Sequence, residues 1–355
     1  MYNVYIRGDI LDKIELNSLR LDELKDYMLS INEESFRGEQ LFSYFHRNMC
    51  YKLDDIQVLP QKLRQSLIEK AYINEIGLLR RYDSKIDNTK KFLFLLEDNN
   101  IIESVLMEYT HGFTACISTQ VGCSMGCSFC ASTKEGRIRN LTPSEMLNQI
   151  YLIEKDVHVK ISNIVLMGSG EPLENYDNTM NFLNIIHHPK GHNISYRNIT
   201  LSTCGIVPKI YELAKENIPI TLSISLHSPF DDIRTDMMPI GKKYKIKDII
   251  DACKYYENIT SRRITFEYTL IEGVNDRKED VDELVKILRK INSHINLIPL
   301  NPIKEFNKDR PSINNIERFQ KQLTRNNIQV TIRNEKGIDI NGSCGQLRRD
   351  YLSDK

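Results

Sequence analysis

The sequence predicts an α/β protein with a mainly parallel sheet, preceded by a smaller helical region. Segments with strand character alternate with amphipathic helical windows from about residue 112 to residue 335. This alternation favours a parallel sheet, open or closed into a full or partial barrel, because parallel strands need a crossover connection that is usually a helix. The composition, 41% apolar and 27% charged, is typical of a globular chain with a buried core.

The first hundred residues show helical periodicity first and strand character later. Apolar side chains recur at helical spacing over three windows, and the last window begins at Pro60, which a first helical turn tolerates. We therefore expect a helical accessory domain over 1–75, followed by a linker with a short β extension over 76–111. The helices are expected over 19–28, 36–45 and 60–71, and the strands over 91–96 and 101–107.

The region 112–335 carries the alternating elements of the predicted sheet. Its first long helix should begin after Thr142, where Thr-Pro-Ser-Glu forms a capping box with proline at the first helical position. The segment 336–355 should be a mobile, glycine-containing C-terminal loop. The strands are expected over 113–118, 161–167, 198–203, 220–226, 263–270, 294–300 and 329–333, and the helices over 143–156, 208–217, 246–258, 280–290 and 313–326.

Charge and hydropathy exclude some classes of protein. The formal net charge is zero, so the bulk charge gives no argument for a nucleic-acid partner. No apolar run approaches the length that spans a bilayer, and the N-terminus lacks the pattern of a secretory signal, so we expect no membrane attachment. The histidines at 187, 188 and 192 lie among proline and glycine and predict an exposed loop rather than a metal site.

Three of the eight cysteines lie within eight residues, as Cys123, Cys127 and Cys130. This C-x₃-C-x₂-C spacing suits three iron ligands of a [4Fe–4S] cluster, which leaves the fourth iron open for a reactive ligand. Structural zinc is the main alternative, but it usually takes four ligands from paired C-x-x-C knuckles, and this segment has one. Unliganded core cysteines are the third interpretation. The crowding of thiols favours a metal centre in a reducing compartment.

The cysteine spacing resembles that of the radical SAM superfamily, in which S-adenosylmethionine (SAM) occupies the open iron. Polar residues at strand ends support the likeness: Gly170-Glu171 follows the second strand of the predicted sheet, and Ser202 ends the third. Ser225-Leu226-His227 ends the fourth, and Asn301 follows the sixth. The carboxyl ends of parallel strands are where α/β barrels build their sites.

Over nearly the whole chain the sequence is similar to the RlmN and Cfr family of radical SAM adenosine methyl synthases. The likeness is carried by CISTQVGC at 116–123, RNLT at 139–142, GVND at 273–276 and the loop 337–347, which holds Cys344 beside glycine. It implies a partial (β/α)6 radical SAM barrel with the β extension described above and with the N-terminal helical domain over 1–75, which we expect to bind RNA. It also implies one [4Fe–4S] cluster per chain, bound by Cys123, Cys127 and Cys130, and two SAM molecules per turnover.

The same resemblance implies roles for individual residues. Cys344 would be methylated by one SAM, and a 5′-deoxyadenosyl radical from a second SAM would take hydrogen from that methyl group before the carbon adds to adenine. Cys116 would then form a transient disulfide with Cys344 and release the product, and Glu103 would accept the proton from the substrate carbon. The residues that would contact SAM are Gly170, Glu171, Ser202, Ser225, Leu226, His227 and Asn301.

The activity that the resemblance implies is methylation at C2 of an adenosine in 23S rRNA and of an adenosine in tRNA. Cfr-type methylation at C8 of the same rRNA adenosine is the alternative; Pro172 favours C2, since Cfr-type sequences tend to carry alanine there. The implied partners are 23S rRNA, tRNA, a low-potential donor of the flavodoxin or ferredoxin type and a thiol reductant. We expect a cytoplasmic monomer. A non-catalytic RNA-binding protein with a structural zinc or iron–sulfur site remains the rival class.

Overall fold

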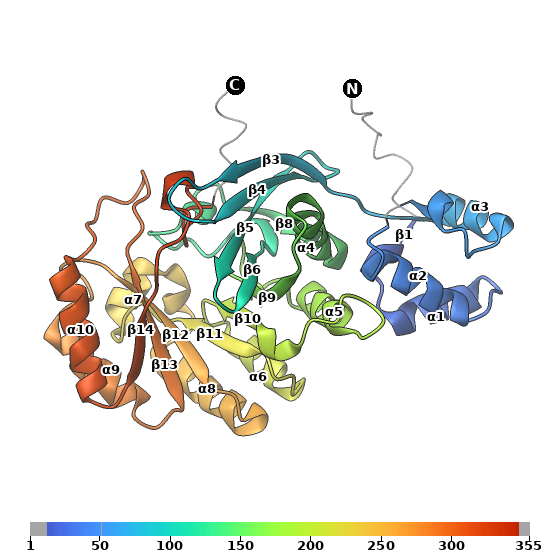
Figure 1. The fold of residues 1–355 in the computed structure, drawn as a ribbon. Coiled ribbons are helices and arrows are strands. Elements are labelled where there is room, and N and C mark those ends of the chain that lie inside the picture. The colour runs from blue at the N-terminus through green and yellow to red at the C-terminus, as the bar shows by residue number, and fades with distance from the viewer. Residues whose placement is uncertain (1–12, 51, 348–355) are drawn as a thin grey trace.

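The computed structural model describes residues 13–50 and 52–347, and its centre is a curved ten-stranded sheet (Figure 1). The strand order is β14-β13-β12-β11-β10-β9-β6-β5-β4-β3, and all pairings from β6 to β14 are parallel. The parallel strands are β6 (Gly112–Cys116), β9 (Ile161–Leu166), β10 (Ile199–Thr203), β11 (Thr221–Ser225), β12 (Ile264–Leu270), β13 (Ser293–Pro299) and β14 (Gln329–Ile332).

The predicted α/β class and partial barrel are confirmed. Every strand expected in the parallel sheet is present, and β14 adds a seventh parallel strand to the six of the expected barrel. Helices connect the strands on the outside of the curve (Figure 1). They are α4 (Pro143–Val157), α5 (Tyr176–His187), α6 (Val207–Lys215), α7 (Asp231–Met237), α8 (Ile246–Thr260), α9 (Lys278–Leu288) and α10 (Ile313–Arg325).

The β extension is an antiparallel continuation of the same sheet. The strands β3 (Gly77–Asp83), β4 (Lys90–Leu95) and β5 (Ile101–Tyr109) pair in sequence, and β5 joins the barrel through β6. The sequence predicted β4 and β5 and missed β3, whose residues are mostly exposed and lack an alternating apolar pattern. The extension therefore widens the sheet beyond the barrel.

The N-terminal part consists of the three predicted helices, closed by a short parallel pairing of β1 (Ile14–Glu15) with β2 (Ala71–Tyr72). The helices are α1 (Leu21–Ser30), α2 (Phe36–His46) and α3 (Gln61–Lys70). Gly38 lets α1 and α2 approach closely, because a Cβ there would lie 2.7 Å from the Lys25 backbone nitrogen. The buried side chains of these helices belong to the same hydrophobic core as those of the barrel. The core therefore does not separate the two parts, and a domain boundary at residue 75 stays a prediction.

The histidine stretch after α5 is not the exposed loop that its sequence predicted. His187 ends α5, and His192 is buried with its Nε2 atom 2.9 Å from the Glu154 carboxylate of α4. The stretch therefore packs α5 and its following loop against α4. Among the described residues, no helix has the length and apolar character needed to cross a bilayer.

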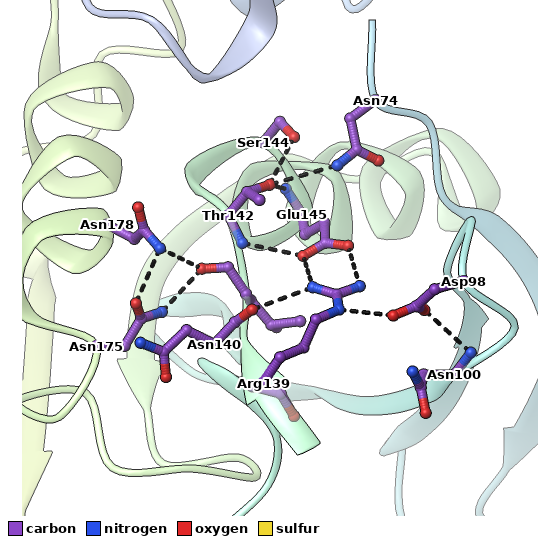
Figure 2. A network of polar contacts seen from close by, with 12 residues as sticks. Asn74, Asp98, Asn100, Arg139, Asn140, Thr142, Ser144, Glu145, Asn175 and Asn178 are labelled. Atoms are coloured by element: carbon purple, nitrogen blue, oxygen red, sulfur yellow. Dashed lines mark hydrogen bonds and ion pairs between the residues drawn. The ribbon is translucent and has the colours of Figure 1, made fainter. Parts of the chain in front are cut away.

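A half-buried guanidinium connects the β extension to the barrel (Figure 2). Arg139 binds Glu145 of α4 through two hydrogen bonds of 2.7 Å and Asp98 of the β4–β5 turn through one of 2.6 Å. Glu145 also closes the predicted capping box with Thr142. Although burial opposes ionisation of Asp98, hydrogen bonds from Arg139 and Asn100 lower the pKa of its carboxyl to about 2.

Replacing Arg139 by alanine should lower the free energy of unfolding by about 3 kcal/mol, because two largely buried carboxylates would lose their counter-charge. The matched control is Arg81→Ala, which removes an exposed arginine that also binds two carboxylates, Asp83 and Asp156. Its cost should stay below about 1 kcal/mol. Denaturant unfolding of the two variants checks this, and equal losses would contradict a special role for the Arg139 network.

Candidate active site

The loop with the three clustered cysteines is framed by a small hairpin, β7 (Gln120–Gly122) with β8 (Arg137–Asn140). Gly122 has φ +74°, and a Cβ there would lie 2.0 Å from the Gly136 carbonyl oxygen, so only glycine closes this hairpin. Cys123, Cys127 and Cys130 line one cavity, which we call the cluster-loop cavity.

The donor set fits a [4Fe–4S] cluster. Three thiols on one loop line a single cavity, and the rest of its wall combines glycines, hydroxyls and apolar side chains with a few charged and titratable groups. Burial raises the pKa of all three thiols, and a neighbouring cysteine raises it further in each case: Cys130 at Cys123, Cys130 and Cys123 at Cys127, and Cys344 at Cys130. A bound metal must therefore supply the positive charge that makes them thiolates. Within 13–50 and 52–347, no three His, Cys, Asp or Glu side chains are grouped as ligands of a single metal ion.

The opposite wall of the cluster-loop cavity is built from the carboxyl ends of the parallel strands. Six of the seven residues predicted to contact SAM line it, namely Gly170, Glu171, Ser202, Ser225, His227 and Asn301. Leu226 does not, because its side chain is fully buried in the main hydrophobic core. The strand-end positions thus converge on the loop of the three cysteines, as parallel topology requires.

Glu171 is held rigidly in this wall. Its two carboxylate oxygens accept hydrogen bonds from the backbone N–H groups of Leu173 (3.0 Å) and Cys204 (2.7 Å). Burial nevertheless raises the pKa of the carboxyl above its ordinary value. An ammonium group in the cavity would relieve that cost, so Glu171 suits a cationic ligand.

His227 presents a defined tautomer to the cavity. Its Nδ1 atom accepts a hydrogen bond of 2.9 Å from the Thr269 backbone N–H, so the proton of the neutral ring is on Nε2. Burial, and the nearby Arg234, lower the pKa of His227 to about 3. The ring therefore stays neutral at physiological pH and acts as a hydrogen-bond donor through Nε2.

Asn301 connects the cluster-loop cavity to the C-terminal loop. Its Nδ2 atom donates to the Cys344 carbonyl oxygen at 3.0 Å. Its Oδ1 atom is buried and has no hydrogen-bond partner among the described residues. A buried acceptor without a partner costs free energy, so this oxygen suits a ligand that donates a hydrogen bond.

Cys344 and Cys116 line a second cavity, which we call the two-thiol cavity. Cys344 also lines the cluster-loop cavity and therefore lies between the two. Burial raises the pKa of both thiols, that of Cys116 to about 12, and the guanidinium of Arg333 opposes the shift at Cys344 and at Cys116. The structure thus brings together two cysteines that are 228 positions apart in sequence (344 − 116).

The C-terminal loop is held in place, contrary to the expectation that it is mobile. The Gly345 and Leu347 carbonyl oxygens accept hydrogen bonds of 2.7 Å from the Ala131 backbone and the Ser132 hydroxyl, directly after the cluster loop. Asp339 accepts from Ser84 and Lys85 of the β3–β4 turn, each at 2.7 Å. Residues 348–355, the end of the expected loop, are outside the described residues.

Glu103 lies on β5 outside both cavities. Its carboxylate is buried and lies 3.4 Å from the Lys91 ammonium group of β4. Strand alternation places its side chain on the same face as Val105 and Met107, and Met107 lines the two-thiol cavity. The geometry brings Glu103 near the site without placing it in the cavity.

The sequence did not single out Arg333, which lines both cavities and is near both Cys116 and Cys344. It also missed Glu267 and Thr269 of β12, which line the cluster-loop cavity. Arg333 directly follows β14, so its place at the end of a predicted parallel strand was a usable signal. Nothing in the local pattern distinguished it from other arginines.

A parallel partial barrel with three cysteines on one loop and polar strand ends facing them defines a radical SAM enzyme. Residues 117–288 match the radical SAM superfamily, and residues 14–73 match the ribosomal RNA large subunit methyltransferase N-terminal domain. The chain belongs to the RlmN family.

Individual relatives agree over nearly full length. The chain is 51% identical over 332 residues to a probable dual-specificity RNA methyltransferase RlmN of Clostridium novyi, covering 94% of this chain and 97% of that protein. A protein of the same description from Alkaliphilus oremlandii is 52% identical over 342 residues, covering 96% and 99%. The crystal structure of a radical SAM methyltransferase from Sphaerobacter thermophilus superposes with a TM-score of 0.88 at 39% identity, covering 95% and 99%.

Gly170→Ala should distort the wall of the cluster-loop cavity where Gly170 and Glu171 lie. Gly170 has φ +112°, and a Cβ there would lie 2.7 Å from Gln120 and Thr119. Gln120 in turn accepts a hydrogen bond from the Glu171 backbone, so a shift would displace the carboxylate. We expect at least a tenfold loss of SAM affinity, measured by equilibrium dialysis on anaerobically reconstituted protein.

Gly273→Ala is the matched control, because Gly273 also has positive φ but nothing lies within 4 Å of a Cβ there. That substitution should cost about 1 kcal/mol of stability from backbone strain alone and leave SAM affinity unchanged. Equal SAM affinities for the two variants would contradict the close-approach argument.

Proposed function

We propose that this enzyme methylates C2 of an adenosine in 23S rRNA and of an adenosine in tRNA, with Cys344 as carrier of the methyl carbon. The observation that carries the proposal is the position of Cys344 between the cluster-loop cavity and the two-thiol cavity. A carrier thiol must first meet SAM and then meet the RNA base. A residue that lines both spaces can do so without a large movement of the chain.

The aromatic C2 carbon is not nucleophilic, so direct transfer of a methyl cation to it has no reasonable barrier, and a covalent carrier divides the reaction into easier steps. The cluster, when bound, supplies the electron that cleaves SAM to a 5′-deoxyadenosyl radical. Cys344 attacks the methyl group of a first SAM through its thiolate, which the positive charge of Arg333 stabilises. Glu171 and His227 orient SAM in the cavity wall.

Product release is assigned to Cys116. Its thiol loses a proton and attacks the Cys344 sulfur, so that a disulfide forms while the bond between that sulfur and the transferred carbon breaks. The carbon leaves with the electron pair of that bond and takes up a proton, which makes it the methyl group of the product. Both sulfurs line the two-thiol cavity, which supports the assignment. The disulfide holds two electrons fewer than the two thiols, so an external thiol reductant must restore them before the next turnover.

Glu103 is proposed as the acceptor of the proton that leaves the substrate carbon. In the structure its carboxylate is paired with Lys91, so the acceptor must exchange that partner for the substrate. The alternative regiochemistry, Cfr-type methylation at C8, has less support, because the relatives with about 50% identity carry the RlmN name and Pro172 is present.

The proposal extends to partners and location. A low-potential flavodoxin- or ferredoxin-type donor would reduce the cluster, and the protein would act as a monomer in the cytoplasm. A reducing compartment would keep its cysteines as thiols; Cys50, Cys204 and Cys253 are free in the structure, as are the five of the proposed site.

The decisive pair of variants is Cys116→Ala and Cys344→Ala. Cys116→Ala should accumulate protein covalently bound to RNA, seen as a slower band that ribonuclease removes, because the resolving thiol is absent. Cys344→Ala should form neither adduct nor product while keeping its iron, since Cys344 is not a cluster ligand in this proposal. Mass spectrometry of digested RNA reports the position of the methyl group.

Buried Cys253 of α8 provides a matched control, because it is remote from both cavities. Cys253→Ala should turn over without accumulating an adduct. A Cys344→Ala protein that still methylates RNA would refute the carrier role. Methylation at C8 instead of C2 would overturn the assigned regiochemistry.

A further inference from the structure

A stacked pair of aromatic rings lies beside the two-thiol cavity. Tyr109, the last residue of β5, stacks on His111 of the β5–β6 turn with ring centroids 5.2 Å apart and planes within 9°. Tyr109 is half-buried, whereas His111 is exposed. The pair therefore extends from the edge of the cavity to the solvent.

The inner end of this stack contacts the thiol site. Tyr109 packs against the apolar cluster that contains Met107, Cys116 and Leu347, and its hydroxyl donates to the Met107 sulfur at 3.5 Å. Met107 and Leu347 line the two-thiol cavity with Cys344. The stack therefore lies against residues of the wall of the cavity that holds Cys344.

A cation stands over the same ring. The Lys336 ammonium group lies 5.7 Å from the Tyr109 ring centroid, and Lys336 itself lines the two-thiol cavity. The exposed Asn334 lines the cavity on this side as well, so the cavity opens to solvent here. Aromatic rings next to a positive charge at an opening are the elements that bind single-stranded nucleic acid, the rings by stacking on bases and the cation by contacting phosphate.

We propose that Tyr109, His111 and Lys336 form a docking platform for the nucleotide that flanks the target adenosine. This inference rests on the proposed function. The neighbouring base stacks on the Tyr109–His111 pair and Lys336 contacts the adjoining phosphate, while the target adenine enters the two-thiol cavity. The platform positions the RNA and takes no part in the chemistry.

The ordinary explanation of these contacts is that they stabilise the β5–β6 turn. A turn could be closed by Tyr109 alone, packed on Met107, and it would not need an exposed histidine stacked outside it or a lysine from the C-terminal loop. These two residues come from the β5–β6 turn and from the loop that carries Cys344. Their convergence at the opening favours a ligand.

The test measures binding rather than turnover. The probe is a synthetic RNA hairpin with an unpaired adenosine in its loop. Two versions are made, with the fluorescent base 2-aminopurine on the 5′ side or on the 3′ side of that adenosine. With the full-length, anaerobically reconstituted protein, stacking should quench 2-aminopurine at one flank. Tyr109→Ala should weaken binding about tenfold and remove the quenching, whereas Tyr109→Phe should keep both.

His111→Ala is the second variant, because its side chain is exposed and its removal leaves the packing on Met107 intact. It should also weaken binding and reduce quenching. Lys336→Gln should lower the slope of log affinity against log salt by about 0.7, the value for one contact with single-stranded phosphate. Tyr255→Ala and Lys290→Gln are matched controls from α8 and the α9–β13 connection, and both should bind as the unchanged protein does.

An independent readout separates failure of the platform from failure of the proposed function. Methylation of Cys344 by SAM needs no RNA and should be unaffected by all of these variants, as seen in the mass of the intact protein. Unchanged affinity and quenching in both Tyr109→Ala and His111→Ala would overturn the platform. A salt slope unchanged by Lys336→Gln would overturn its phosphate contact. If the unchanged protein binds the hairpin but neither methylates Cys344 nor modifies the RNA, the proposed function fails instead.

Discussion

The site depends on hydrogen bonds that hold the C-terminal loop against the end of the cluster loop. Gly345 and Leu347 bind Ala131 and Ser132, and the Cys344 carbonyl oxygen accepts from Asn301 at the end of the sheet. Because Ala131 follows Cys130 directly, any change in the cluster loop would be transmitted to residue 344. If Cys344 is the carrier, as proposed, its position is therefore set by the same loop that holds the proposed cluster ligands.

The ionisable groups that line the two cavities differ in how burial and nearby charges affect their protonation. Burial raises the pKa of the cavity thiols and of the Glu171 carboxyl, so a nearby positive charge favours the ionised form of each. Arg333 supplies such a charge at the boundary between the cavities, and the bound cluster and SAM would supply it elsewhere. His227 stays neutral and can donate a hydrogen bond without adding a charge. Charge is thus concentrated where a thiolate must form.

Local patterns in the sequence predicted a large part of this arrangement. Cys123, Cys127 and Cys130 lie within one loop, so their spacing can be read from the sequence directly. The positions of the polar strand ends follow from the βα alternation. Neither prediction needs knowledge of the tertiary packing. The β7–β8 hairpin was missed because its strands have three and four residues, and α5 because Asn178, Asn181 and Asn184 weaken its helical propensity.

Contacts between residues far apart in the chain could not be predicted from the sequence. The Lys91–Glu103 pair depends on the β4–β5 register, and the fixed position of the C-terminal loop depends on contacts such as Asp339 with Ser84, 255 positions away. Arg333 stands at the end of a predicted strand, but its position beside both cavities comes from the fold. These features arise from packing between segments and therefore required the structure.

The central claim is that the methyl carbon passes through Cys344 as a carrier, and deuterium labelling tests it most directly. SAM with a fully deuterated methyl group should give adenosine whose new methyl group has lost one deuterium, with that deuterium recovered in 5′-deoxyadenosine. Hydrogen must be removed from the carrier carbon before it can add to the base, which explains the loss. Transfer of the methyl group with all its deuterium retained would contradict the account.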